Sequence, residues 1–326
     1  MRDIWGFDFD SLTNQGWSGV ASRDSSVKRT GTHSLSTGGV GVNSPSFSNV
    51  SAIYVGFAVN LTSLSGTVHT IISLMDGGTQ QITITRETDG SIKIRRGGVG
   101  GTVLGSSAAG VLNVAGVFFH VQVFASIHSS TGSAEVRVEG ATVASASGVN
   151  TNNSGVAQVN ALQLVGPSGA DTIKFDDLWV DDSSFLGDMK IETLFPSANG
   201  ANNNFTANGA ASAYQCCDET PANDDTDYAS SGTVNDRQTF ALTNLLSTVG
   251  QVKAVKITHR SRKDDVGART VAPLLTTQSV QSQRATVSLS TSYGTFSEVL
   301  ITDPADSNPF TISNLNAAEV GMKIIS

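Results

Sequence analysis

The sequence predicts an all-β protein made of two tandem antiparallel β-sandwich domains, and three observations lead to this fold class. Charged residues are only 15% of the 326 residues, and Gly, Ser, Thr, Asn and Ala are abundant, a composition that suits strands and turns better than helices. Apolar and polar residues alternate in short runs that turn-forming residues separate. The length is great for one core, so we expect two domains, at residues 1–186 and 187–326.

The first domain opens with Trp5, Phe7 and Phe9, which alternate with small or acidic residues and predict a first strand. Further strands are expected, in chain order, at Thr30–Ser36, Ile53–Asn60, Gln81–Arg86 and Ser91–Arg96. The last two form a hairpin whose turn ends in an Asp-Gly pair. Its inward side chains are expected to be Ile82, Ile84, Ile92 and Ile94.

The stretch Gly116–Gly140 has the clearest strand pattern in the chain, with a polar turn at Ser129–Ser133 and a reversal at Glu139–Gly140. Because side chains alternate along a strand, we expect one face to be core and the other, with His120 and Gln122, to face solvent. The expected core residues of this domain are Trp5, Phe7, Phe119, Val121, Val123, Val136, Val138 and Phe175.

The closing strand of this domain is expected at Asp171–Val180, where the apolar residues change parity, so that a bulge at Asp176–Asp177 or burial on both faces is required. The second domain carries short alternating runs that predict another antiparallel sandwich. Its strands are expected at Thr239–Leu242, Val252–Thr258, Thr286–Ser290 and Phe296–Ile301.

The charge pattern argues against nucleic acid as a partner, since the net charge is −8 and each half of the chain carries 10 basic and 14 acidic side chains. The N-terminus has no apolar signal segment, and no apolar run is long enough for a membrane helix, so we expect synthesis in the cytoplasm and no membrane partner. The adjacent Cys216 and Cys217 are expected to be free thiols without zinc, because no metal-ligand spacing accompanies them.

No catalytic motif is present, and we therefore expect no enzyme and no cofactor. The histidines lie outside nucleophile and metalloprotease motifs; they are His33, His69, His120, His128 and His259. Glu135 and Glu139 could form a glycosidase pair, but Arg137 lies between them, so a charge-alternating exposed face explains them better.

An acidic loop offers candidate calcium ligands, because hard cations need clustered oxygen atoms. The candidates are Asp218, Asp224, Asp225 and Asp227. They lack the glycine and final glutamate of an EF-hand, and the simpler interpretation is a solvated loop ordered by Asx-turns. We therefore expect no bound metal. The basic stretch Lys253–Lys263 lacks interleaved aromatic residues and is interpreted as a protein-contact edge.

The first domain resembles the concanavalin-like, laminin-G-type jelly roll. The resemblance rests on Gly116–Gly140, which has the family's aromatic-His-Val strand followed by an alternating strand, and on Arg29–Leu35, which fits its Arg-x-Gly-x-x-Ser-Leu pattern. It also rests on FDDLWV at residues 175–180. The resemblance implies a jelly-roll fold in which this closing strand returns beside the first strand.

Residues 170–326 resemble structural proteins of tailed bacteriophages. The similar segments are FDDLWV, the IETLFP that follows it, the DDTDY of the acidic loop and the final AAEVGMKI. The resemblance implies a virion protein, as a capsid decoration, a fibre or a tail-associated component, that acts through contacts with other capsid or tail proteins. It also implies a homo-oligomer, with a trimer as the expected state. In that assembly, the acidic loop of one subunit is expected to meet the basic stretch of another.

The alternative hypothesis is a carbohydrate- or receptor-binding module on the virion. A glycan would then stack on exposed aromatic rings of the first domain, for which the candidates are Trp17, Tyr54 and Trp179. The aromatic content of only 6% weakens this alternative.

Overall fold

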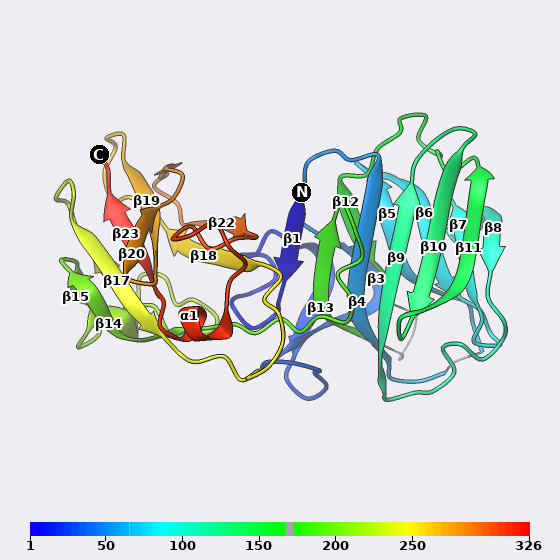
Figure 1. Cartoon of the computed structure of the whole chain (residues 1–326), viewed down its shortest axis with the longest axis horizontal. Coiled ribbons are helices and arrows are strands. Elements are labelled where there is room, and N and C mark those ends of the chain that lie inside the picture. Colours follow the sequence, from blue (N-terminus) through cyan, green and yellow to red (C-terminus); the bar gives the residue numbers. More distant parts are fainter. Residues whose placement is uncertain (65, 167–171) are drawn as a thin grey trace. The chain divides into compact units, whose positions relative to one another are not determined.

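The computed structural model describes residues 1–64, 66–166 and 172–326, and it confirms the predicted all-β class (Figure 1). Strands dominate, and every strand pair in the described residues is antiparallel. Helical structure in these residues is limited to the 3-10 turn η1 (Ala213–Cys216) and the short helix α1 (Ile312–Asn316). None of it has the length and apolar character needed to cross a membrane.

The chain forms two compact units. The first contains Met1–Asp8 and Gln15–Ile191, and the second contains Phe9–Asn14 and Glu192–Ser326. In the described residues, the boundary between the two units thus falls after Ile191, five residues later than the boundary expected from the sequence. A short N-terminal segment, moreover, belongs to the second unit.

The first unit is one continuous antiparallel sheet that folds over on itself. Its strands are β1 (Arg2–Trp5), β2 (Ser18–Asp24), β3 (Ser34–Asn43), β4 (Ala52–Leu61), β5 (His69–Asp76), β6 (Thr79–Arg86), β7 (Ile92–Arg96), β8 (Thr102–Ser106), β9 (Phe118–Ser126), β10 (Gly132–Val138), β11 (Ala141–Val149), β12 (Ala161–Leu164) and β13 (Ile173–Asp181). Their order is β11-β10-β9-β4-β13-β3-β12-β5-β6-β7-β8, with β1 beside β13 and β2 beside β3. The end strands β8 and β11 contact each other, which closes the sheet around its core.

The core of the first unit confirms most of the predicted alternation. All the expected inward isoleucines of the β6–β7 hairpin are fully buried, as are Val121, Val123, Val136 and Phe175. Trp5, Phe7 and Val138 are also buried, whereas Phe119 is only half-buried. Burial of these side chains is the main favourable term in folding this unit.

Two local features predicted from the sequence are present, a hairpin turn and a β-bulge. Glu139 and Gly140 join β10 to β11 with φ values of 50° and 80°, the two positive values that a type I′ hairpin turn requires. The pairing of β13 with β4 shifts between Asp176 and Trp179, and Asp177 has φ of 52°, so the expected bulge is confirmed. Strand β13 also pairs with β1, as expected, while Asp171 lies outside the described residues.

The N-terminal strand is shorter than predicted. It ends at Trp5, and Phe9 belongs to the second unit. The Asp8 carboxylate accepts hydrogen bonds from the backbone N–H groups of Thr32 and His33, at 2.8 Å each. These bonds keep Asp8 and the segment at Thr32 and His33 out of strand geometry. The two N–H groups already donate to Asp8, so they cannot pair with a neighbouring strand. The strand expected at Thr30–Ser36 is β3, and it therefore begins at Ser34 rather than at Thr30.

The second unit consists of smaller antiparallel sheets. Its strands are β14 (Pro196–Asn203), β15 (Thr206–Asn208), β16 (Tyr228–Ser230), β17 (Arg237–Leu242), β18 (Val255–Ser261), β19 (Thr270–Thr277), β20 (Val280–Gln283), β21 (Val287–Ser288), β22 (Gly294–Leu300) and β23 (Glu319–Ile324). The largest sheet has the order β14-β17-β23-β19-β20, with β21 on β19; the other pairs are β15–β16 and β18–β22.

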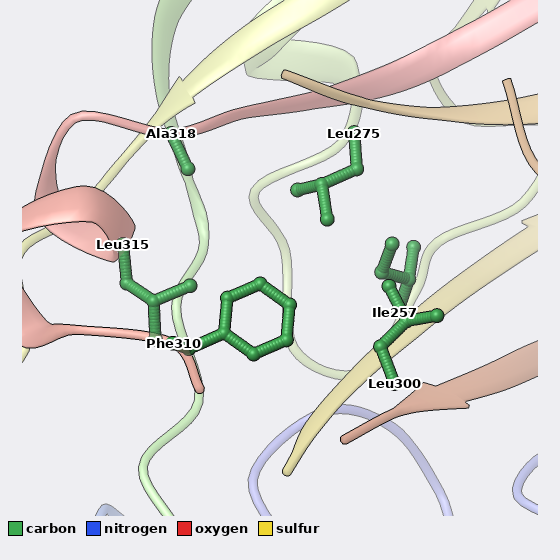
Figure 2. Close-up of a cluster of buried hydrophobic side chains, with 6 residues drawn as sticks. All are labelled: Ile257, Leu275, Leu300, Phe310, Leu315 and Ala318. Carbon is green, nitrogen blue, oxygen red and sulfur yellow. The ribbon is translucent and has the colours of Figure 1, made fainter. Parts of the chain in front are cut away.

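An apolar cluster lies between these elements, and Figure 2 shows its side chains pointing toward one another. It contains Ile257, Leu275, Leu300, Phe310, Leu315 and Ala318. The four strands predicted for this half correspond to β17, β18, β21 and β22, with ends displaced by a few residues.

Candidate functional site

One outer face of the first unit collects polar and aromatic side chains from β13, β4, β9 and β10. They alternate with the core residues, so they point away from the core. Pairing aligns them in rows across the sheet: Asp176 with Ala58 and His120; Trp179 with Gly56, Gln122 and Arg137; Asp181 with Tyr54, Phe124 and Glu135. We call Tyr54, Asn60, His120, Gln122, Arg137 and Trp179 on this surface the strapped face.

Trp179 lies directly on Gly56, its partner on β4. A Cβ atom at position 56 would stand 2.2 Å from the indole ring, closer than any real contact. The glycine therefore provides the space into which the ring packs. Trp179 is only 1% exposed as a result, so its ring is not presented at the surface as the sequence led us to expect.

The segment 183–191, which we call the strap, lies on this face. The Phe185 ring packs edge-on against Tyr54 at 4.9 Å between centroids, and the Arg137 guanidinium stands 4.0 Å above it. His120 interacts with the backbone of Gly187. The strap backbone thus lies against His120, which is only 4% exposed, and the neighbouring Gln122 is 3% exposed. The expectation that this side of β9 faces solvent is therefore wrong.

Arg29 fastens the strap to the sheet. Its guanidinium donates to both oxygens of Asp188 at 2.6 Å, to the Met189 carbonyl at 3.0 Å and to Asp177 at 2.9 Å. Asp177 in turn accepts a hydrogen bond from the Ile191 N–H at 2.8 Å. The Asp177 carboxylate thus binds both Arg29 and the end of the strap. The β-bulge that positions Asp177 therefore has a structural role.

Four polar atoms of the strapped face are buried without a hydrogen-bond partner. They are Asn60 Oδ1, His120 Nε2, Gln122 Nε2 and Trp179 Nε1. A buried polar group left unpaired costs about 1–3 kcal/mol, so such groups are rare in folded proteins. Their concentration on one face is the feature of this surface that most needs an explanation.

Two neighbouring carboxylates under the strap have perturbed acidity. Burial raises the pKa of Asp176 to about 7, although Asp176 Oδ2 accepts hydrogen bonds from the Arg29 and Thr30 N–H groups at 2.8 and 3.2 Å. Burial also raises the pKa of Asp177, and it lowers the pKa of His120. Burial thus disfavours the charged form of all three groups.

We expect the first unit to lose stability as the pH rises from 5 to 8. The folded state keeps the Asp176 proton up to about pH 7, while the unfolded chain loses it near pH 4. A raised carboxyl pKa stabilises the fold at low pH, and that contribution is lost as pH rises through the folded pKa. Relative to Asp176→Asn, the wild type should lose about 2 kcal/mol between pH 5 and 8 in urea denaturation. Parallel pH profiles for the two proteins would contradict this assignment.

A second polar surface, which we call the polar ladder, crosses the other part of the sheet through β3, β12, β5, β6 and β7. Its side chains are Asn43, Ser73, Gln80, Thr83, Thr85, Glu87, Lys93, Arg95 and Gln163. At one end Gln163 Nε2 donates to Asn43 at 3.1 Å, and Gln80 Nε2 donates to Gln163 Oε1 at 3.3 Å and to Ser73 at 3.1 Å. The Ser73 and Thr83 hydroxyls are 2.9 Å apart, which continues the ladder onto β6.

The other end of the polar ladder centres on Glu87. Lys93 Nζ and Arg95 donate to its carboxylate at 3.0 and 3.1 Å, and the Thr85 hydroxyl donates at 2.8 Å. Partial burial opposes ionisation of Glu87, but the hydrogen bonds from Thr85, Lys93 and Arg95 prevail and lower its pKa. The carboxylate is therefore charged at neutral pH and faces two cations.

The other two aromatic candidates have different environments. Trp17 is 4% exposed and packs in the core against Trp5 and Phe7, with centroids 6.0 and 5.9 Å apart. Tyr54 is half-buried and stacks on Phe124 at 4.7 Å. Only Tyr54 of the three expected rings keeps substantial exposed surface.

The acidic loop of the second unit is held by arginines. Asp224 binds Arg260 through both oxygens, at 2.5 and 2.7 Å, and Asp225 binds Arg262 at 2.7 Å. These acidic and basic stretches pair within the chain, and a contact between subunits stays a prediction. The described residues contain no group of three or more acidic, His or Cys side chains that could hold a metal ion, and Asp218 and Asp227 complete no such group.

The two cysteines in the described residues are free thiols, with Cys216 buried and Cys217 exposed. Cys216 Sγ lies 3.7 Å from the Asn208 carbonyl oxygen and 3.6 Å from that of Ser212. Its thiol therefore serves as a weak donor within the loop that follows β15.

No family model and no curated protein matches this chain. Solved structures similar to it include the cellulose-induced protein Cip1, at 16% identity and a TM-score of 0.39, over 58% of this chain and 94% of that one. Alginate lyase Aly36B matches at 12% identity and a TM-score of 0.37, over 59% and 98%. A Trypanosoma rangeli sialidase mutant matches at 12% identity and a TM-score of 0.35, over 51% of this chain and 27% of that one.

At these identities and TM-scores the likeness carries no argument about what this chain binds or catalyses. It does correct one expectation. Enzymes, namely an alginate lyase and a sialidase, are among the similar structures. The prediction that the chain is not an enzyme is therefore wrong, because it excluded an enzymatic activity that similar structures have.

Proposed function

We propose that the first unit binds carbohydrate through the polar ladder. The observation that carries this proposal is a pair of hydrogen-bonded networks on one face of five adjacent strands. Amide and hydroxyl groups run from Asn43 to Thr83, and a hydroxyl, a guanidinium, an ammonium and a carboxylate group meet around Glu87. Sugar hydroxyls both donate and accept hydrogen bonds, and planar amide and ion-pair groups can engage two of them at once.

The ladder is fixed before a ligand arrives. Ser73, Thr83 and Thr85 are fully buried beneath the longer side chains, while Gln80 and Gln163 are half-buried and reachable from solvent. Because each longer side chain is already held by a neighbour, binding would cost little additional side-chain entropy. A polar surface of this kind supports recognition by hydrogen bonding rather than by stacking on rings.

The charges of the ladder favour an acidic glycan. Lys93 and Arg95 face the single carboxylate of Glu87, an excess of one positive charge among the side chains of the ladder itself. An acidic polysaccharide would form ion pairs with these cations as well as hydrogen bonds, whereas a neutral one would form hydrogen bonds alone.

A glycan array that contains neutral and acidic polysaccharides tests this proposal with the full-length protein. We expect the acidic members to bind most strongly and their affinity to fall as salt is raised, since exposed charges are screened. An array in which no glycan binds above background would contradict the proposal.

The virion role implied by the sequence resemblance stays a prediction. Exposed apolar side chains of the second unit support a role in contacts between proteins: Leu246 and Val249 are each 83% exposed, and Val266 is 98% exposed. A glycan-binding first unit and a second unit that attaches to capsid or tail are compatible in one virion protein.

A further inference from the structure

We propose that the strapped face is a second binding site, separate from the polar ladder, which takes a neutral polyhydroxylated ligand and which the strap covers in the structure described here. The proposal rests on the buried unpaired atoms, on the pairing of the surrounding charges and on how the strap is attached.

The unpaired atoms form a mixed set of donors and acceptors. Trp179 Nε1 and Gln122 Nε2 can only donate, Asn60 Oδ1 can only accept, and His120 Nε2 can do either, according to its tautomer. Their residues are each at least nine-tenths buried. A ligand that satisfies all of them must itself carry several hydroxyl-like groups that both donate and accept.

The strand register sets the length of this ligand. Trp179 and Gln122 flank Gly56, His120 pairs with Ala58, and Asn60 lies two residues further along β4. At about 3.3 Å per residue, positions 56 and 60 are about 13 Å apart along the strand. This span is that of a short oligosaccharide rather than of a single small polyol.

The charges around the strapped face disfavour an ionic ligand. Arg137 is paired with Glu135 at 2.7 Å, and Lys174 is paired with Asp24. Arg29 is shared between Asp177 and Asp188. Because these cations already have carboxylate partners, an acidic sugar would have to break an existing pair, whereas a neutral one would not.

The middle of the strap, Phe185–Asp188, is held by contacts that can be broken at modest cost, whereas its end at Ile191 is fixed to the buried Asp177. The Asp188 side chain is 51% exposed, and an ion pair with so exposed a group contributes little free energy. The Phe185 contacts with Tyr54 and Arg137 add one aromatic pair and one cation–π contact. Segments with few buried contacts open locally without global unfolding.

The test compares the full-length wild type with a strap-release variant, Phe185→Ser with Asp188→Ala, on an array of neutral oligosaccharides, followed by calorimetry with each member that binds. We expect the variant to bind at least ten-fold more tightly than the wild type. Adding Gln122→Ala should remove that gain, since it deletes one of the unpaired donors. Lys190→Ala, an exposed position of the strap, is the matched control and should leave affinity unchanged.

Amide hydrogen exchange of the strap, measured on the same proteins, reports whether it has been released. A variant with faster exchange in the strap and no gain in binding would overturn the proposal, because the polar atoms would then be satisfied by water alone. Binding that is equal in all variants and insensitive to Gln122→Ala would also overturn it. If the double variant is unstable, Asp188→Ala alone provides the same comparison.

Discussion

Gly56→Ala is expected to destabilise the first unit by roughly 3 kcal/mol. The new methyl group would stand 2.2–2.4 Å from the indole ring of Trp179, and that ring is only 1% exposed, so it has little freedom to move away. Urea denaturation followed by tryptophan fluorescence measures the loss, which should appear as a lower midpoint with little change in slope.

Gly100→Ala is the matched control for this substitution. A Cβ atom at Gly100 would have nothing within 4 Å, so its midpoint should remain close to that of the wild type. Equal midpoints for Gly56→Ala and Gly100→Ala would show that Trp179 does not pack on β4 as described.

Val121→Asp is expected to have the largest effect of any substitution considered, about 4 kcal/mol or more. Val121 is fully buried and lies opposite Phe57 of β4, where a carboxylate would have no partner and would lose its hydration. Thermal denaturation followed by circular dichroism should show loss of the first unit's transition, or its shift to a much lower temperature.

Val117→Asp, just before β9, provides the comparison for that experiment, since Val117 is 48% exposed and its replacement leaves the charge in water. Its melting temperature should stay within a few degrees of the wild type. If Val121→Asp behaved in the same way, the register of β9 would be wrong.

The sequence predicts those parts of the fold that depend on local pattern. Alternation along Gln81–Arg86 and Ser91–Arg96 places four isoleucines inward, and all four are buried. The Glu139–Gly140 reversal follows from the turn preferences of these residues, and the Asp176–Asp177 bulge follows from the change of parity. Each of these features is decided by neighbours within a few residues.

The strap could not be predicted in this way. Its Phe185 contacts Tyr54 and Arg137, which are distant in sequence and carry no periodic signal that points to it. The boundary expected from the sequence, between residues 186 and 187, falls within the strap. His120 and Gln122 are buried by tertiary contacts, which alternation along a strand does not encode, so the pattern of β9 correctly predicted their face but not their environment.

The polar ladder left a partial signal in the sequence. Thr83, Thr85, Lys93 and Arg95 occupy the outward positions of the predicted hairpin, so their shared face could have been read from the alternation. Their connection to Gln163 and Asn43 depends on the order β3-β12-β5, which brings together strands far apart in the chain. Likewise, composition alone does not distinguish a core tryptophan such as Trp17 from one that lies at the surface.

The most direct test of the central claim compares Arg95→Ala with Arg96→Ala in calorimetric titration with an acidic glycan selected on the array. The two residues are neighbours on β7, but Arg95 belongs to the polar ladder, while Arg96 points to the other side and donates to Thr102. We predict that Arg95→Ala weakens binding about ten-fold, or about 1.4 kcal/mol, and that Arg96→Ala leaves it within two-fold. Equal losses in both variants, or no loss in Arg95→Ala, would contradict carbohydrate binding at the polar ladder.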